Sequence, residues 1–354
     1  MRVHHIVNDV CLQNGGAQRV VRQLHIGLRE AGLDSQVVSL CHSVKGLESA
    51  LSLQNRSPYV HSAFESVLRY IRTECTTEDI IHVHLFPSLL YVAVAVRLLG
   101  WKGKLVCTEH STSNGRRNSW IGKLMDSLIY PRYDRIYCIS DGVQTALEKW
   151  MPRQSDKLRT VVNGVSLPFQ NFRGRAAGEK IAIASAGRLS KPKNYETALK
   201  ALALLEDVDF EYRIAGIGEA ESELKQLCAR LNLENKVKFC GYVEDIFCFL
   251  ESADIFLIPS LWEGFGLAAV EAMNAGLSVV ASDVSGMREI FDTVEPCGIT
   301  VSPNSPDEIA SAVRACLDAE TRAEFGQRAF VRSLSFSKER MVESYLNEYA
   351  RLAK

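Results

Sequence analysis

Short apolar runs alternate with amphipathic segments along the whole chain. Runs rich in Val, Ile and other aliphatic residues predict buried strands, and the segments between them, apolar at every third or fourth position, predict helices. In the first half we predict strands at 3–8, 36–41, 80–84, 104–108, 135–140 and 159–162. In the second half we predict strands at 181–186, 210–215, 237–240, 255–259, 278–281 and 298–301.

Repeated strand–helix–strand units predict an α/β fold with parallel sheets and right-handed crossovers. The 354 residues are enough for two domains, and the hydrophilic stretch 166–180 suits a connection between them. We therefore predict two doubly wound, Rossmann-like domains, 1–168 and 169–337, facing a central cleft. The final helix, 338–354, is predicted to pack back on the first domain.

Composition favours a globular protein, with 47% hydrophobic and 23% charged residues. The chain has no apolar run of about 18 residues and no signal-peptide pattern. Its ten cysteines are scattered without a C-x-x-C pair, which is typical of reduced thiols, so a cytoplasmic location is predicted. Residues 1–169 hold 20 Lys and Arg against 14 Asp and Glu, whereas 170–354 hold 21 against 28. The first half is therefore expected to favour an anionic surface or acceptor, with no nucleic-acid partner.

The strongest candidate site lies between the predicted strands at 255–259 and 278–281. Glu263 and Glu271 flank the start of a predicted helix there, with seven residues between them. Gly264 and Gly266 allow a ligand to approach the backbone, and free amides at a helix start suit a phosphate. In a parallel sheet, ligands bind at the carboxyl ends of the strands. Two surface glutamates on an ordinary amphipathic helix are the alternative interpretation.

Three further segments carry candidate chemistry. Arg188 and Lys193 follow the strand at 181–186 and could neutralise a departing diphosphate, or could be solvated loop cations. Gly16, in the pair that opens the first helix, could face an anion or form a plain turn. His110 ends the strand at 104–108, where a neutral imidazole could bond a sugar hydroxyl.

A possible membrane contact lies at 114–132, which mixes basic, aromatic and aliphatic residues. Such a segment is typical of a membrane-surface helix, and core packing with a basic rim is the equal alternative. No metal site is predicted: His82 and His84 lack identifiable further ligands, and the Asp207/Asp209 pair precedes a strand instead of ending one.

Four motifs together resemble one known family. Gly15-Gly16, Gly187-Arg188 with Lys193-Asn194, Gly241-Tyr-Val243 and the Glu263/Glu271 pair stand in the order seen in retaining nucleotide-sugar glycosyltransferases of family 4, which have the GT-B fold. The likeness covers nearly the whole chain. It implies transfer of a sugar from a nucleotide donor, UDP-linked in most of the family, with retention of configuration and no metal or other cofactor.

The resemblance also implies residue roles. Glu263 would bond donor-sugar hydroxyls, Glu271 would hold the ribose, and Val243 would meet the uracil through its backbone. The diphosphate would be bound by the side chains of Arg188 and Lys193 with the backbone amides of Phe265, Gly266 and Leu267. His110 resembles the family's active-site histidine, and Gly16 would lie near the donor phosphates. The family most often has glycine where this chain has Asn194.

The reaction expected from the resemblance is a front-face displacement, because no side chain is placed as a nucleophile. The acceptor is expected to be a saccharide or a lipid-linked saccharide, in bacterial polysaccharide or lipopolysaccharide synthesis. A nucleotide-sugar epimerase on the same fold and a non-catalytic glycosyltransferase-like subunit are the alternatives.

Overall fold

The computed structural model describes residues 1–11, 15–42, 47, 49–172 and 180–353. The chain forms two compact units. Unit 1 comprises Met1–Ser166 together with Lys338–Lys354, and unit 2 comprises Leu167–Ser337. The sequence placed the corresponding boundary at 168 and gave the last helix a segment of its own.

Unit 1 contains a seven-stranded parallel sheet in the order β3-β2-β1-β4-β5-β6-β7. Its central strands are buried along nearly their whole length, which is why they appear in the sequence as continuous apolar runs. The strands are β1 (Arg2–Val7), β2 (Asp34–Cys41), β3 (Leu51–Asn55), β4 (Ile80–His84), β5 (Lys104–Glu109), β6 (Arg135–Cys138) and β7 (Leu158–Thr160).

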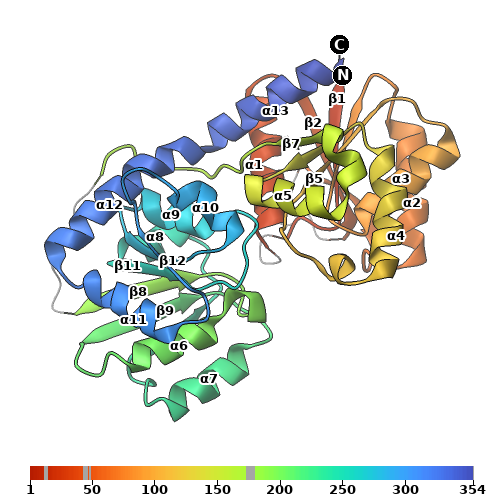
Figure 1. Cartoon of the computed structure of the whole chain (residues 1–354). Helices are drawn as coiled ribbons and strands as arrows, with labels where there is room; N and C mark the ends of the chain where they lie inside the picture. The colour runs from red at the N-terminus through yellow and green to blue at the C-terminus, as the bar shows by residue number, and fades with distance from the viewer. Residues whose placement is uncertain (12–14, 43–46, 48, 173–179, 354) are drawn as a thin grey trace. The chain divides into compact units, whose positions relative to one another are not determined.

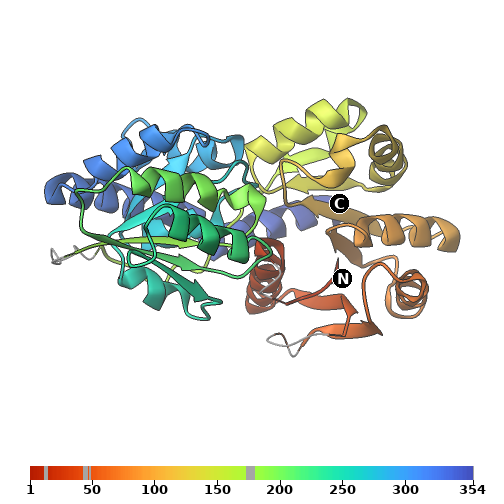
Figure 2. The same ribbon diagram turned by 90° about the horizontal axis from the view of Figure 1, so that it is seen from below.

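Helices cover both faces of this sheet (Figures 1 and 2). Helix α1 contacts α13, and α2 contacts α3, which in turn contacts α4. The helices of unit 1 are α1 (Gly16–Glu30), α2 (His61–Glu74), α3 (Ser88–Leu99), α4 (Trp120–Ile129), α5 (Asp141–Trp150) and α13 (Lys338–Ala353). The last of these covers the sheet with Tyr345 and Tyr349, both fully buried.

Unit 2 contains a six-stranded parallel sheet in the order β10-β9-β8-β11-β12-β13. The strands are β8 (Ile181–Ala186), β9 (Phe210–Ala215), β10 (Val237–Gly241), β11 (Ile255–Ile258), β12 (Ser278–Ser282) and β13 (Ile299–Val301). The helices are α6 (Tyr195–Ala203), α7 (Glu221–Arg230), α8 (Ile246–Glu251), α9 (Leu267–Asn274), α10 (Ser285–Phe291), α11 (Pro306–Ala315) and α12 (Ala319–Ser333).

The helices of unit 2 form two layers. On one face α6 packs against α7 and α11, and their apolar side chains share a buried core with Ile183, Tyr212 and Ile214 of the sheet. On the other face α12 packs on β12 and α9, and α8 contacts α9 (Figure 1). A sheet covered on both faces leaves the ends of its strands as the place where polar loops meet.

The predicted fold, two doubly wound parallel-sheet domains, is confirmed. The prediction overlooked β3, an edge strand whose sequence Leu51-Ser-Leu-Gln-Asn55 is only partly buried and therefore lacks an apolar run. Part of the predicted connection, 173–179, and Asn14 lie outside the described residues. Among the helices that the structure describes, none combines the length and the apolar character needed to span a membrane.

Close packing of α13 on α1 depends on the absence of a side chain at Gly27. A Cβ atom built there would lie 2.4 Å from Cγ2 of Val342. We expect Gly27→Ala to destabilise unit 1 by about 1–3 kcal/mol through overpacking, offset in part by the roughly 1 kcal/mol gain in helix propensity. Denaturant unfolding of the two single variants and the Gly27→Ala/Val342→Ala double variant measures this. Strict additivity of the two substitutions would contradict the packing argument.

Candidate functional site

The candidate donor site lies along the carboxyl edge of the sheet in unit 2. Neighbouring loops are joined there by backbone hydrogen bonds: the Gly187 amide donates to the Ala215 carbonyl at 2.9 Å, and the Gly216 amide donates to the Gly241 carbonyl at 2.7 Å. A Cβ atom at Gly216 would lie 1.9 Å from the Gly187 carbonyl oxygen, so only glycine allows these loops to lie so close. The loops after β8, β9 and β10 thus form one continuous edge.

Two of the predicted residues meet in this edge. The Lys193 Nζ atom lies 2.6 Å from Oε1 of Glu263, and the Ser260 hydroxyl donates to the same oxygen at 2.8 Å. The Leu261 amide also donates to the Pro192 carbonyl at 2.8 Å, so backbone as well as side chains connect the two loops. Because the strands before these loops, β8 and β11, are hydrogen-bonded neighbours, the sequence segments around 190 and 262 are brought together.

Asn194 explains how this chain departs from the usual glycine of the family. It adopts the left-handed conformation, with φ 53° and ψ 36°, between the 3-10 turn Lys191–Lys193 and α6. Asn tolerates this conformation better than other residues with a side chain. Its amide also donates to the carbonyls of Pro259 at 3.0 Å and Pro303 at 2.7 Å. Its side-chain oxygen accepts from the Thr197 hydroxyl at 2.8 Å. The substitution therefore keeps the turn and adds three bonds that a glycine cannot make.

Arg188 lies on the same edge but has a different partner. Its guanidinium pairs with Glu219, in the loop after β9, at 3.1 Å. Both side chains are more than half exposed, and such surface pairs contribute about 0–1 kcal/mol. Arg188 can therefore exchange Glu219 for an anionic ligand at little cost. Val243 is half-buried, two residues beyond the end of β10.

The start of α9 is shaped by Gly266. This N-cap residue has φ 98°, and a Cβ atom there would lie 2.3 Å from the sulfur of Met287. Phe265 is buried edge-on against Phe336, so only its backbone is available to a ligand. Leu267 is the first helical residue, and the N-cap residue Gly266 provides no side-chain cap. Glu271, in the middle of α9, is only 3% exposed.

In unit 1 the predicted residues lie near strand ends. Gly16 is the first residue of α1, preceded by Gly15 as N-cap, which provides no side-chain cap. Gln18, in the first turn of α1, donates its side-chain amide to Asp9 at 3.3 Å. His110 directly follows β5 and is half-buried. Burial lowers the pKa of His110 to about 4, so its imidazole is neutral at physiological pH.

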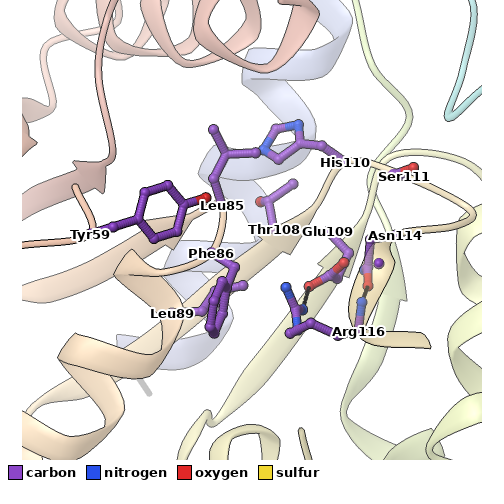
Figure 3. A pocket seen from close by; sticks show the side chains of 11 residues that line it. Tyr59, Leu85, Phe86, Leu89, Thr108, Glu109, His110, Ser111, Asn114 and Arg116 are labelled. Atoms are coloured by element: carbon purple, nitrogen blue, oxygen red, sulfur yellow. Dashed lines mark hydrogen bonds and ion pairs between the residues drawn. The ribbon is translucent and has the colours of Figure 1, made fainter. Parts of the chain in front are cut away.

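His110 lines a cavity of about 430 Å³ in unit 1 (Figure 3). One wall is apolar and aromatic, made by Tyr59, Leu85, Phe86 and Leu89. The opposite wall is polar, made by Thr108, Glu109, His110, Ser111, Asn114, Gly115 and Arg116. An apolar wall facing convergent hydrogen-bonding groups is typical of a small-ligand site.

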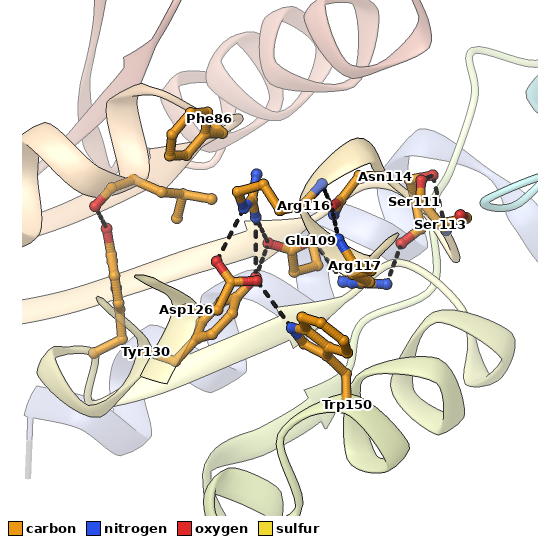
Figure 4. Close-up of polar contacts among 12 residues, drawn as sticks. Phe86, Glu109, Ser111, Ser113, Asn114, Arg116, Arg117, Asp126, Tyr130 and Trp150 are labelled. Atoms are coloured by element: carbon orange, nitrogen blue, oxygen red, sulfur yellow. Dashed lines mark hydrogen bonds and ion pairs between the residues drawn. The ribbon is translucent and has the colours of Figure 1, made fainter. Parts of the chain in front are cut away.

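A network of paired charges supports the polar wall (Figure 4). Glu109 accepts from the Tyr130 hydroxyl at 2.5 Å and from Arg117 at 3.0 Å. Asp126 accepts from Arg116 at 2.9 Å and from the Trp150 indole at 3.0 Å. Burial, and then the neighbouring Glu109, hold the pKa of Tyr130 well above its usual value, so its hydroxyl stays a donor. Two arginines thus balance two carboxylates, and the wall carries little net charge.

This network is not predicted from the sequence. The sequence assigns no role to Glu109, and Asp126 falls within the segment 114–132, where a membrane contact is considered. The available signal was a carboxylate at the end of a buried strand followed within eight residues by Arg116 and Arg117, since a buried acid requires a partner. The arrangement that satisfies both acids depends on Asn114 and Ser119, whose side chains cap the turn Gly115–Asn118 and helix α4.

Comparison with known proteins defines the class of this protein. Residues 14–168 match the model of glycosyltransferase family 4, and residues 168–332 match the model of the group 1 glycosyl transferases. An N-acetylgalactosaminyltransferase of *Campylobacter jejuni* that acts on a diphospho-undecaprenol-linked saccharide is 30% identical over 268 residues, covering 72% of each chain. The fold and these matches are those of a glycosyltransferase. The chain belongs to glycosyltransferase family 4, as its motifs suggested.

Proteins that match this chain over nearly their full length include further glycosyltransferases. An uncharacterised glycosyltransferase of *Haemophilus influenzae* is 24% identical over 348 residues, covering 94% of this chain and 95% of its own. Among solved structures, HepE of *Anabaena* with UDP and glucose superposes with a TM-score of 0.85 at 20% identity, covering 99% of this chain and 100% of its own. The lipopolysaccharide outer core galactosyltransferase WaaB gives a TM-score of 0.76 at 15% identity, covering 98% of each chain.

The turn at Asn194 provides a test of how the donor edge is built. Asn194→Gly keeps the left-handed turn and removes three side-chain hydrogen bonds, whereas Asn194→Ala also imposes backbone strain of about 1 kcal/mol. We expect both variants to be less stable than the wild type in denaturant unfolding, with Ala the worse of the two. An alanine variant as stable as the glycine variant would show that the left-handed conformation is not required.

Proposed function

We propose that this chain is a retaining, metal-independent glycosyltransferase that takes a sugar from a nucleotide sugar, UDP-linked by preference. The observation that carries the proposal is the Lys193–Glu263 pair, built across two strand ends beside the uncapped start of α9. A cation, a carboxylate and free backbone donors on one edge match the parts of a sugar diphosphate. The solved structures of HepE in complex with UDP and with UDP-glucose support the choice of nucleotide.

The proposed reaction is a displacement on the face from which the diphosphate leaves. The bond between the anomeric carbon and the diphosphate oxygen breaks, and the acceptor oxygen bonds to the same carbon. The acceptor proton passes to the departing diphosphate. Arg188 and Lys193 take up the growing negative charge, with the amides of Phe265, Gly266 and Leu267, so no metal ion is needed for this task.

The remaining roles follow the same proposal. Glu263 holds donor-sugar hydroxyls with Oε1 fixed by Ser260 and Lys193, and Glu271 holds the ribose. Val243 meets the base through its backbone. In unit 1, Gly16 is the residue proposed for the donor phosphates, and His110 is proposed to bond a sugar hydroxyl. No other cofactor is required, because the nucleotide sugar is a substrate.

The cavity of unit 1 is proposed to bind the acceptor's sugar. Its polar wall pairs its own charges, so it suits an uncharged polyhydroxyl ligand better than a bare phosphate. Phe86 and Leu89 give apolar contact area next to the hydrogen-bonding groups, and the Phe86 ring stacks against the Arg116 guanidinium at 4.6 Å. The undecaprenol-linked saccharide in the name of the *Campylobacter* relative supports a lipid-linked acceptor, in polysaccharide or lipopolysaccharide synthesis.

The two alternatives differ from this proposal in what they need. An epimerase would convert the donor without an acceptor, and a non-catalytic subunit would not need an intact site. The relatives and solved structures described above carry glycosyltransferase names, and the paired Lys193 and Glu263 are in place. Neither alternative is favoured.

The test of the proposal is a panel of UDP- and GDP-sugars assayed for slow donor hydrolysis, and then for transfer, with a chelator present throughout. We expect one donor to be turned over at the same rate with and without chelator. Proton NMR of the product should show the donor's anomeric configuration retained. Loss of turnover in chelator would contradict metal independence, and an inverted product would contradict the front-face reaction.

Two variants separate donor binding from leaving-group stabilisation. Glu271→Ala is expected to raise the KM for the donor at least tenfold, because a charge-assisted bond contributes about 1.5–3 kcal/mol. Arg188→Ala is expected to lower kcat by about 10- to 1,000-fold with a smaller change in KM. Glu219→Gln is the control, because it removes the ion-pair partner of Arg188 and leaves the positive charge of the Arg188 guanidinium in place. A kcat for Arg188→Ala equal to that of the wild type would remove the role assigned to Arg188.

We also propose that unit 1 contacts the cytoplasmic face of a membrane through α3 and α4. On α4, Trp120, Ile121, Leu124 and Leu128 are between 55% and 76% exposed. Leu98 of α3, a helix that contacts α4, is also 66% exposed. Large apolar side chains gathered on neighbouring helices are unusual on a monomer and mark an interaction surface.

Charge favours an anionic lipid surface as the occupant. Between residues 110 and 133 the sequence has four basic residues and one acid, Asp126, which is buried and paired with Arg116. Arg97, Lys123 and Arg132 are exposed around the apolar side chains. An apolar helix face with Trp and a basic rim is the pattern of an interfacial membrane helix. Such a contact would keep a lipid-linked acceptor within reach.

Vesicle binding tests the membrane proposal. We expect the protein to sediment with phosphatidylglycerol-containing vesicles and only weakly with pure phosphatidylcholine. Leu124→Asp/Leu128→Asp should lower the binding constant at least tenfold, because burial of each leucine contributes about 1.5–3 kcal/mol. Val331→Asp, at an apolar position of unit 2 that is 61% exposed, is the matched control. Wild-type vesicle binding by the double variant would contradict the proposal. So would a wild-type protein that is a dimer in solution while the double variant is a monomer, because the surface would then join two copies of the chain.

A further inference from the structure

Three imidazoles form a hydrogen-bonded chain in unit 1 that ends at His110. Nδ1 of His5 lies 3.2 Å from Nε2 of His84, and Nδ1 of His84 lies 3.1 Å from Nε2 of His110. His5 is on β1 and His84 on β4, and both are fully buried. The strands are adjacent and parallel, so the three rings lie on one face of the sheet.

A second set of hydrogen-bonded side chains lies on the same face of the sheet, and its members bond one another. His82 bonds the hydroxyls of Tyr349 at 2.6 Å and Thr108 at 2.7 Å, and Thr108 bonds the Tyr345 hydroxyl at 3.0 Å. Nitrogen atoms of His5, His82 and His84 also lie within 4.8 Å of one another, the spacing of a metal site. Both nitrogens of His82 are already bonded, however, so a metal would have to displace Tyr349 or Thr108.

The chain of His5, His84 and His110 restricts the tautomers of its members. Burial lowers the pKa of His5 to about 3 and of His110 to about 4, and holds that of His84 well below its usual value. Each neutral ring therefore carries one N–H. Because each ring has one N–H, both ring-to-ring hydrogen bonds form only if every N–H donates in the same direction along the chain, either toward His110 or toward His5. All three tautomers therefore change together or not at all.

Only the two ends of the chain differ between its two states. Either His110 carries hydrogen at Nδ1 and His5 has a bare Nε2, or His5 carries hydrogen at Nε2 and His110 has a bare Nδ1. Among the described residues, neither of these end nitrogens has a hydrogen-bond partner. Both nitrogens are buried in the structure. A buried N–H without an acceptor costs about 1–3 kcal/mol, so the favoured state is the one whose N–H belongs to a ring that lines a cavity open to a ligand or water.

The cavity decides between the two ends. His110 lines the 430 Å³ cavity, whereas His5 is fully buried under the sheet's helices and lines no part of it. We propose that His5 and His84 are positioning residues that hold His110 as its Nδ1–H tautomer, so that His110 donates a hydrogen bond to an oxygen atom of the ligand in the cavity. The proposed function enters this proposal only in the identity of the ligand, which is expected to be a sugar.

This tautomer is a distinctive signature, because a free neutral histidine prefers hydrogen on Nε2. Long-range ¹H–¹⁵N spectra of histidine-labelled protein distinguish a protonated ring nitrogen from a bare one, and the His110→Gln variant assigns the signals. The wild type is expected to show His110 protonated at Nδ1. His84→Phe, which keeps a planar ring and removes the partner of Nε2, should shift His110 to the Nε2–H tautomer. His5→Phe, two rings away, should shift it in part.

His4→Phe is the matched control. His4 is a fully buried neighbour on β1, but it lies on the opposite face of the sheet and bonds Tyr70 at 2.7 Å. It should leave the His110 tautomer unchanged. Nε2 protonation of His110 in the wild type would overturn the proposal even if no variant folds, and so would an unchanged tautomer in folded His84→Phe. Purified protein that contains one bound metal ion per chain, and in which a chelator changes the signals of His5, His82 and His84, would overturn the proposal as well. None of these results depends on glycosyl transfer.

Discussion

Parallel pairing of every strand is the constraint on which the rest of this molecule depends. Each described strand pair in both sheets is parallel, so each strand is followed by a crossover, and all the strand-to-helix loops of a sheet gather at its carboxyl edge. Because helices cover both faces, this edge is where polar side chains can meet a ligand. Lys193 and Glu263 meet there although 70 residues separate them in the chain.

The two units use that edge in different ways. Unit 2 keeps its loops close with glycine and asparagine turns and leaves a cation, a carboxylate and an uncapped helix start on it. Unit 1 builds a cavity wall whose arginines and carboxylates neutralise each other. The first arrangement suits a charged diphosphate and the second an uncharged sugar, so the electrostatics support the proposed division between donor and acceptor.

Buried polar groups in unit 1 are organised into chains instead of isolated pairs. A single histidine or acid inside a sheet would lose its hydration without compensation, whereas His82, Thr108 and the tyrosines of α13 satisfy one another. The C-terminal helix is therefore part of unit 1 for polar as well as apolar reasons. Hydrogen bonds also link His110 to His84 on β4 and, through His84, to His5 on β1. The hydrogen-bonding state of His110 is therefore coupled to residues on two other strands.

The sequence by itself determined the alternation of strands and helices, the two-domain parallel fold and the family, because these depend on local periodicity and on short motifs around Arg188, Val243 and Glu263. It missed β3, whose edge position leaves no apolar run, and it could not join Glu109 to Asp126 or His5 to His110. Only the tertiary structure decided those contacts, and it showed that Asn194 takes over a glycine's turn. The physical reason is that a pattern along the chain reports which side chains are buried, whereas strand order decides which buried side chains meet.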